Sequence, residues 1–214
     1  SLEPWIYSCE WDEKLPKLNE LREKVKKMGL WLPQISTDYG GIGLSLEEHG
    51  EISEILGGSP YGFYVFNCQA PDAGNMEILI EVGTSQQKKD YLTPLLEGKT
   101  RSCFAMTEPG YAGSNPTRMG TTAEKENGNY IINGHKWFTS SFDGADFAIV
   151  MVVTDPDEAN PYKRASQIIV PTKTEGVEFV RNVSIMGHPG GGWESHAEIK
   201  FNNVIVPESN LLGS

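Results

Sequence analysis

The sequence has few cysteines, no long apolar run and little positive charge. Its three cysteines, Cys9, Cys68 and Cys103, are odd in number and widely spaced, so they predict neither a disulfide framework nor a CxxC metal site. Reduced, buried thiols in an intracellular compartment are therefore expected. No apolar stretch approaches the roughly 20 residues that span a bilayer, and the first residues lack the basic and apolar parts of a signal peptide.

The charge balance and the missing motifs exclude further classes. A formal net charge of -11 argues against a surface that neutralises phosphates, so neither nucleic acid nor an anionic membrane is expected as a partner. The four histidines stand at no HExxH spacing and beside no cysteine pair, so no metal site is predicted. GxSxG, Walker and GxGxxG motifs are absent as well. Any nucleotide cofactor must bind by other means.

The first hundred residues carry the signals of helices. An apolar stripe from Leu15 to Met28 recurs at steps of three and four residues and is followed by Gly29, where a helix would end. Ser45–Glu48 and Thr84–Gln87 each fit a capping box that opens a helix. We therefore predict an all-helical domain over residues 1–100.

From Arg101 the pattern changes to short strands separated by turns. Glu126-Asn127-Gly128-Asn129 predicts a hairpin, and Asn133-Gly134 predicts a second turn. The apolar run from Phe147 to Val153 is typical of a buried strand. The strand spacing favours an antiparallel barrel or sandwich over residues 101–214, which makes the fold class α+β.

Two stretches of this second half could face a ligand. In CFAMTEPGYAGSN, residues 103–115, an apolar strand meets Glu108 and Pro109 and then a loop of small residues that would let the chain approach another body closely. Lys136-Trp137-Phe138 places two aromatic rings on a predicted strand, where core packing is the simpler interpretation. Glu108 could serve as a general base, although nothing in the sequence shows what would tune its pKa. The residues alone do not name a reaction.

Taken together, these stretches resemble the acyl-CoA dehydrogenase family. Phe104 to Pro109, ending in Ala112-Gly113-Ser114, is similar to the family's TEP motif, and Ile132 to Ser140 resembles its NGxKxW signature. Pro71 to Glu77 and Val204 to Pro207 also stand where the family has similar residues. The likeness covers nearly the whole chain in the right order.

The resemblance implies an architecture and a chemistry. Members have an N-terminal helical domain, a middle β domain and a C-terminal helical domain, and this chain resembles the first two. FAD would lie against the middle domain, acyl-CoA would lie on the other flavin face, and a carboxylate of the third domain would remove the substrate's α-proton. The resemblance therefore assigns no catalytic base within these residues, and Glu108 matches a motif glutamate that is not the family's base.

The resemblance also implies a set of binding residues. Thr107 and nearby backbone N–H groups would bond the polar edge of the flavin, Phe138 would pack on the ring in place of the family's tryptophan, and Ser114 would reach the cofactor pyrophosphate or the acyl-CoA. The loop Gly110-Tyr111 is one residue longer than the common form. The predicted cofactor-binding residues are Phe104, Met106, Thr107, Gly113, Ser114, Phe138, Thr139 and Ser140, with Ser114 also predicted to bind substrate.

Three functions remain open at this point. The first is an acyl-CoA dehydrogenase that passes electrons to an electron-transferring flavoprotein, with this chain alone inactive. The second is a homologue that binds FAD or acyl-CoA without catalysis. The third is an acyl-CoA oxidase or monooxygenase of the same fold. The family implies a homodimer or homotetramer in the bacterial cytoplasm, mitochondrion or peroxisome.

Overall fold

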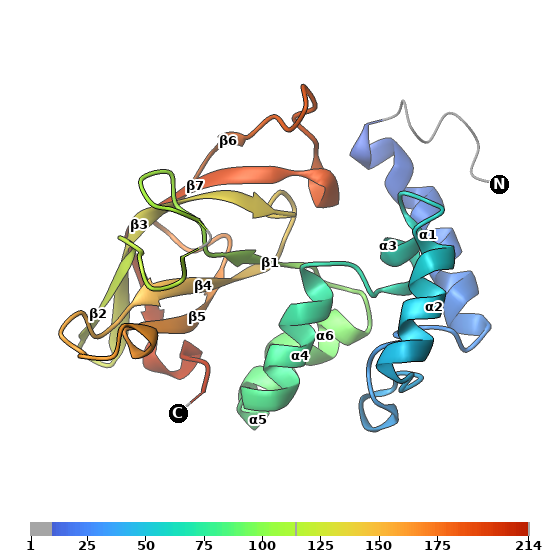
Figure 1. Cartoon of the computed structure of the whole chain (residues 1–214), viewed down its shortest axis with the longest axis horizontal. Helices are drawn as coiled ribbons and strands as arrows, with labels where there is room; N and C mark the ends of the chain where they lie inside the picture. Colours follow the sequence, from blue (N-terminus) through green and yellow to red (C-terminus); the bar gives the residue numbers. More distant parts are fainter. Residues whose placement is uncertain (1–9, 114, 214) are drawn as a thin grey trace.

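The computed structural model describes residues 10–113 and 115–213, as helices followed by a curled sheet (Figure 1). The α+β class expected from the sequence is confirmed. The α-helices are α1 (Trp11–Lys27), α2 (Leu46–Leu56), α3 (Gly62–Phe66), α4 (Asp72–Val82), α5 (Ser85–Gln87) and α6 (Thr93–Leu96). The strands are β1 (Ser102–Ala105), β2 (Thr122–Glu126), β3 (Asn129–Ser140), β4 (Phe147–Val153), β5 (Ala165–Pro171), β6 (Val177–Asn182) and β7 (His196–Pro207).

The helices form where the sequence has apolar stripes and capping boxes. The apolar stripe predicted in the first helix is confirmed by α1, which buries Leu18 and Val25 and is followed by Gly29 at φ 70°. Both predicted capping boxes form, with Ser45 and Thr84 each accepting a bond from the backbone N–H three residues on. Each box satisfies two backbone N–H groups that would otherwise lack a partner at the helix start.

The sheet is mixed, so the expectation of a purely antiparallel sheet is wrong. The strands run in the order β1-β4-β2-β3-β7-β6, with β5 on the other side of β4. β1 pairs with β4 in parallel, as does β2 at one end, while the remaining pairs are antiparallel. The parallel pairs join β4 to β1 and to Thr122 at the start of β2, and this long-range pairing is encoded by no turn signal.

The hairpin predicted at Asn127-Gly128 joins β2 to β3, with both residues at positive φ. The second turn, predicted at Asn133-Gly134, is wrong because β3 continues through it with a register shift against β7. The Asn133 carboxamide bonds Asn203 on β7 instead. A Cβ on Gly134 would lie 2.2 Å from the Thr121 hydroxyl oxygen, so the glycine serves close packing.

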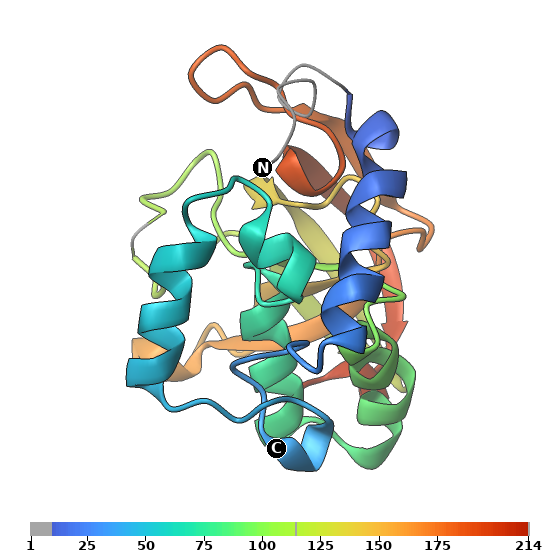
Figure 2. The same cartoon turned by 90° about the vertical axis from the view of Figure 1, so that its right-hand side faces the viewer.

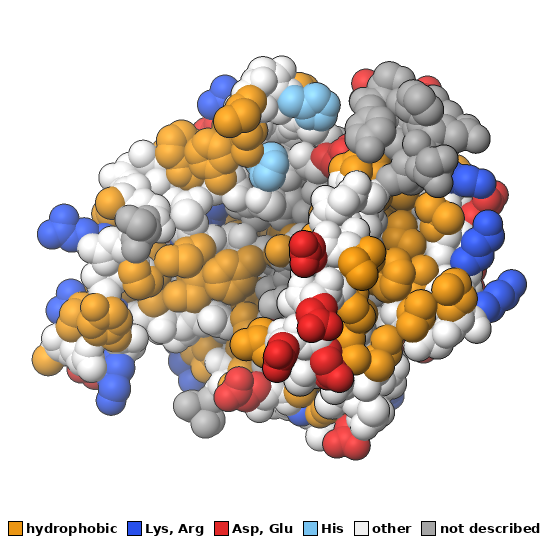
Figure 3. Space-filling view, turned by 45° about the vertical axis from the view of Figure 1, so that its right-hand side comes forward, with side chains coloured by type: hydrophobic (Ala, Val, Ile, Leu, Met, Phe, Trp, Pro, Cys, Tyr) orange, Lys and Arg blue, Asp and Glu red, His pale blue; other side chains and the backbone are white. Residues whose placement is uncertain are grey.

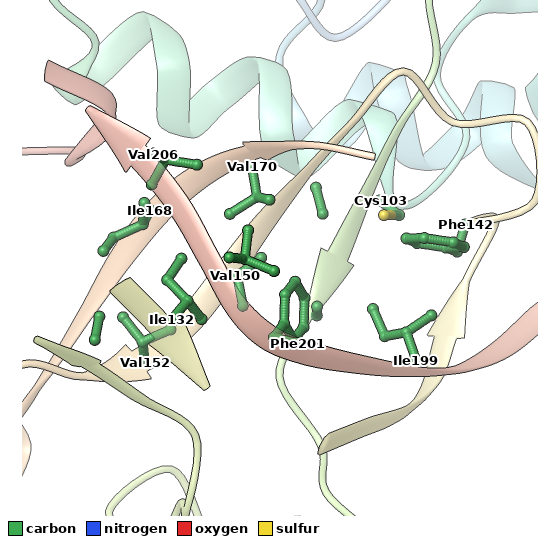
Figure 4. Close-up of a cluster of buried hydrophobic side chains, with 14 of the residues drawn as sticks. Cys103, Ile132, Phe142, Val150, Val152, Ile168, Val170, Ile199, Phe201 and Val206 are labelled. Carbon is green, nitrogen blue, oxygen red and sulfur yellow. The ribbon is translucent and has the colours of Figure 1, made fainter. Parts of the chain in front are cut away.

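The two faces of β4 bury different partners. Ala148, Val150 and Val152 point into the curl of the sheet, together with Ile132 and Phe201 (Figure 4). The alternate residues of β4 face the helices. Figure 2, turned so that the right-hand side of Figure 1 faces the viewer, shows the helices in front of the sheet. The residues that pack there include Phe147, Ile149 and Ile169 of the sheet and Met76, Leu79, Leu92 and Leu95 of the helices.

Several polar contacts join the helical and sheet parts near residues 70–72. Lys14 of α1 forms an ion pair with Glu194 at 2.9 Å, and the Trp193 indole N–H donates to the Ala70 carbonyl at 3.0 Å. The Asp72 carboxylate accepts from the Ser102 amide at 2.7 Å. These contacts set residues 70–72 opposite residues 193–196.

Among the described residues, no helix is both long enough and apolar enough to cross a bilayer.

Candidate ligand-binding site

A cavity of about 530 Å³ lies where the helical part meets the sheet. Figure 3 shows the surface hollowed between the two parts, beside a band of hydrophobic side chains. Three predicted site residues from two strands meet here, because Phe104 of β1 and Phe138 and Ser140 of β3 all line the cavity. The other lining residues are Ala70, Pro71, Ser141, Trp193, Glu194 and His196.

A larger hollow of about 860 Å³ lies elsewhere, beside α1 and α6. The cations that line it already bond the protein: Arg22 donates to the Tyr64 carbonyl and the Asn67 side chain, and Lys26 donates to the Glu97 carbonyl. Because those donors are engaged in joining the helices, the smaller cavity at the predicted motifs is the better candidate site.

Phe138 stands in an unusual backbone position. Its φ is 48°, in the left-handed region that a residue with a side chain rarely adopts, and it lies in a register shift between β3 and β7. The ring is 41% exposed and packs edge-on against Trp137, with centroids 4.9 Å apart. A strained residue that exposes an aromatic ring beside a cavity indicates a functional constraint.

Thr107 and Trp137 hold the two motifs together. The Trp137 amide donates to the Thr107 carbonyl at 3.0 Å, and the Thr107 hydroxyl donates to the Trp137 carbonyl at 2.6 Å. These bonds replace the pairing to β7 that the register shift interrupts. The hydroxyl hydrogen of Thr107 is therefore already engaged, and its oxygen is left to accept rather than donate.

A buried ion pair lies behind this junction. Lys136, with a fully buried side chain, donates to Glu108 at 2.8 Å and to the Met106 carbonyl at 2.9 Å. Glu108 also accepts from the Gly120 amide and from the amide and hydroxyl of Thr121. Burial alone would raise the pKa of Glu108, but Lys136 and these donors lower it below its usual value.

These contacts decide the role of Glu108. Both carboxylate oxygens are bonded to the protein and the residue is 4% exposed. A general base must be within reach of the proton that it removes, and this carboxylate faces the interior instead. Glu108 therefore fixes the loop to β3.

The structure places some of the remaining predicted residues beside the cavity and others away from it. Met106, Thr107 and Gly113 line a small crevice beside the cavity, and a Cβ on Gly113 would lie 3.1 Å from the Thr107 methyl group. Thr139 has a buried side chain that lines neither the cavity nor the crevice, and its hydroxyl has no bonding partner among the described residues. Ser114 lies outside the described residues.

The cavity wall also contains residues that the motifs did not predict. The Ser140 hydroxyl lies 2.8 Å from Nδ1 of His196, its pairing partner on β7. Burial lowers the pKa of His196, which favours the neutral imidazole. Glu194 bonds Lys14 and the Tyr61 hydroxyl. The dense cluster Trp193-Glu194-Ser195-His196 directly after a run of glycines is a signal in the sequence that could have pointed to these residues.

The site has the features of a pocket for a planar ligand: exposed Phe138, half-buried Phe104, and hydroxyls at the edge of a curled sheet that helices cover. Within residues 10–113 and 115–213, no group of His, Cys, Asp and Glu side chains is placed to hold a metal ion. The chain thus combines a helical part and a mixed sheet with a cavity lined by aromatic and hydroxyl-bearing side chains.

Comparison with known families names the class. Residues 1–99 match the model for the acyl-CoA dehydrogenase N-terminal domain, and residues 103–204 match the model for the acyl-CoA dehydrogenase middle domain. The chain belongs to the acyl-CoA dehydrogenase family.

Individual relatives agree. The chain is 42% identical over 207 residues to mouse acyl-CoA dehydrogenase family member 10, covering 92% of this chain and 19% of the relative. It is 41% identical to "Probable acyl-CoA dehydrogenase FadE2" of Mycobacterium tuberculosis, covering 92% of this chain and 48% of that protein. A solved structure from Mycobacterium abscessus, assigned as an acyl-CoA dehydrogenase, superposes with a TM-score of 0.87 at 38% identity, covering 93% of this chain and 49% of that one. The chain thus spans less than half the length of these relatives.

Proposed function

We propose that this chain forms the cofactor-binding part of an FAD-dependent acyl-CoA dehydrogenase, which oxidises the α,β carbon–carbon bond of an acyl-CoA thioester. Family membership supports the reaction class, since all three relatives described above are named as acyl-CoA dehydrogenases. When bound, FAD would supply the hydride acceptor that no side chain provides.

One observation carries the proposal. The backbone of β3 adopts a left-handed conformation at Phe138 and exposes its ring, in the same cavity that Phe104 and Ser140 line. A strained conformation at a half-exposed aromatic residue has a stability cost that binding of a ring system would offset. The residues present therefore fit the planar part of a flavin.

The chain's own residues would hold and orient the cofactor. Phe138 and Phe104 supply apolar contact, Thr107 and Ser140 supply hydroxyl groups, and Gly113 keeps the loop close to Thr107. Met106 lies in the crevice beside them, and Thr139 could contribute only through its backbone. The role of Ser114 toward cofactor and substrate stays a prediction. Glu108 and the cavity-lining Glu194 are both engaged by the protein, Glu108 by Lys136 and Glu194 by Lys14 and the Tyr61 hydroxyl, so we assign the base to another segment.

The remaining parts of the proposal follow the family. Acyl-CoA is the substrate, an electron-transferring flavoprotein is the electron acceptor, and the active form is a homodimer or homotetramer. The division at residue 100 remains a prediction, as does an intracellular location. Cys68 and Cys103 are free and buried, and burial raises the pKa of both thiols, that of Cys68 to about 12, which disfavours the reactive thiolate. Cys9 lies outside the described residues.

The gene product tests the proposal directly. It should contain a flavin whose visible absorption bleaches without oxygen when an acyl-CoA of suitable chain length is added. Bound flavin without bleaching by any acyl-CoA would favour the non-catalytic homologue, and peroxide formed in air would favour the oxidase or monooxygenase.

Two phenylalanines of the sheet provide a matched pair of variants. Phe138→Ala should weaken FAD binding by about fivefold or more, because an aromatic contact is worth roughly 0.5–1.5 kcal/mol beyond its buried area. Phe179→Ala is the control, since Phe179 is 48% exposed on β6 and stacks on Phe142 instead of lining the cavity. Equal effects of the two substitutions on FAD affinity would remove Phe138 from the site.

A further inference from the structure

Two hydroxyls of the proposed site, that of Thr107 in the small crevice and that of Ser140 at the cavity, have a common arrangement. Thr107 donates its hydrogen to the Trp137 carbonyl, which can only accept. Ser140, three residues further along β3, has His196 Nδ1 at 2.8 Å, and no other hydrogen-bond partner of its hydroxyl is found among the described residues. Ser140 lines the cavity, so the direction of its hydroxyl hydrogen affects what it offers a ligand there.

The imidazole determines that direction. A neutral imidazole has one N–H and one acceptor nitrogen. No described residue bonds to Nε2 of His196, and the side chain borders the open cavity, so Nε2 is the nitrogen that can keep its hydrogen toward solvent or ligand. Nδ1 is then the acceptor, and the Ser140 hydroxyl is the donor to it.

We propose that His196 is a positioning residue whose Nδ1 accepts the Ser140 hydrogen, so that the Ser140 oxygen faces the ligand as a hydrogen-bond acceptor. This inference rests on the proposed flavin site. Together with Thr107 of the small crevice, it gives the walls of the proposed site two acceptor hydroxyls where the sequence analysis expected donors around Thr107. Reduced isoalloxazine carries more ring N–H groups than the oxidised form, so such a wall should favour the reduced cofactor.

The first test needs no ligand. Nitrogen-15 NMR of the ligand-free gene product, labelled at histidine and assigned by loss of the signal in His196→Asn, should show His196 with its hydrogen on Nε2 and a hydrogen-bonded Nδ1. Ser140→Ala should remove the Nδ1 hydrogen-bond shift. A hydrogen on Nδ1 would overturn the proposal, as would a His196 signal that Ser140→Ala leaves unchanged.

The second test measures FAD affinity in both redox states. His196→Leu should weaken binding of reduced FAD by about two- to tenfold, the worth of one hydrogen bond, and change oxidised FAD less. His196→Asn should restore the difference, because its amide oxygen can occupy the position of Nδ1. Equal weakening of both states would indicate a merely structural role and overturn the proposal.

Two controls separate the possible failures. His135→Leu removes a histidine on β3 that bonds Glu198 and lines no part of the cavity, so it should leave the ratio of affinities unchanged. In a Ser140→Ala background, His196→Leu should have no further effect, and a persisting effect would contradict action through Ser140. Absence of FAD from the wild-type protein would refute the proposed function, while the NMR experiment would still decide the position of the His196 hydrogen.

Discussion

Among the residues that the structure describes, two carboxylates are buried, Asp72 in the helical part and Glu108 in the sheet part, and their environments differ. Asp72 begins α4, is 1% exposed and accepts from three neutral donors: the Ser102 amide, the Ser102 hydroxyl and the Gln69 carboxamide. Glu108 is 4% exposed and has an ammonium group, that of Lys136, 2.8 Å away. Burial raises the pKa of Asp72, whereas the pKa of Glu108 is lowered despite burial.

The difference shows what each carboxylate contributes. At Asp72 the neutral donors offset only part of the cost of removing the charge from water, whereas at Glu108 Lys136, together with Thr121 and Gly120, reverses the shift. Glu108 thus forms an ion pair with Lys136 that connects the loop to β3 within the sheet part, which we call the charged joint. Asp72 belongs to a polar joint between the helical and sheet parts, and it tolerates loss of its charge.

The largest expected effect comes from breaking the charged joint. Lys136→Met would leave the Glu108 carboxylate buried without a cation, which costs about 3–5 kcal/mol of unfolding free energy. Urea denaturation of the variant and the wild type measures this loss. The double variant Glu108→Gln/Lys136→Met should recover much of it, because no uncompensated charge remains. A loss below about 1 kcal/mol in Lys136→Met would show that the pair matters little.

This joint also shows the limit of sequence reasoning. Leu18 and Ser45 predicted their helices because the pattern and the cap are local. Phe104, Phe138 and Ser140 were found through motifs, and the structure brings them to one cavity. Pro71 and His196 were missed because they reach it by folding of segments far apart in the chain. The parallel pairing of β1 with β4 was missed for the same reason.

The ion pair of Lys14 and Glu194, which also connects the helical and sheet parts, should have an intermediate effect on stability. The Lys14 side chain is 5% exposed and its partner Glu194 is 25% exposed, so the pair is only partly removed from water. Lys14→Met should cost about 1–2 kcal/mol, less than Lys136→Met, because Glu194 keeps water and the Tyr61 hydroxyl. Thermal denaturation measures the difference. A loss as large as that of Lys136→Met would contradict the ranking by burial.

The two carboxylates should also differ in pH dependence. Asp72 has a raised folded pKa, so its contribution is complete below its usual value of 3.8 and is lost as the pH rises through the folded value. Stability of the wild type relative to Asp72→Asn should therefore fall with rising pH. At neutral pH the variant should lie within about 1 kcal/mol of the wild type, since Gln69 has an unpartnered oxygen that an amide flip turns toward the new Asn amide.

Glu108 should show the opposite trend. Its folded pKa is lowered, so its contribution is present above the usual value of 4.5 and is lost as the pH falls through the folded value. Stability of the wild type relative to the double variant Glu108→Gln/Lys136→Met should fall toward acid. Urea denaturation of the wild type, Asp72→Asn and Glu108→Gln/Lys136→Met from pH 3 to 7 measures both stability differences. If the two differences changed with pH in the same direction, the assignment of opposite pKa shifts would be contradicted.

The smallest loss of stability is expected from an exposed ion pair, which serves as a reference for the buried ones. Lys17 and Glu20 form an ion pair at 3.0 Å within α1, but their side chains are 50% and 62% exposed. Water and salt screen such a pair, and ordering two long side chains costs entropy, so Lys17→Met should change stability by roughly 0–0.5 kcal/mol. The Lys17 pair is nearly as short as the Lys136 pair, so distance alone predicts equal losses. Only the burial of the partners separates the two, and comparable losses in urea denaturation would mean that burial does not set the strength of these joints.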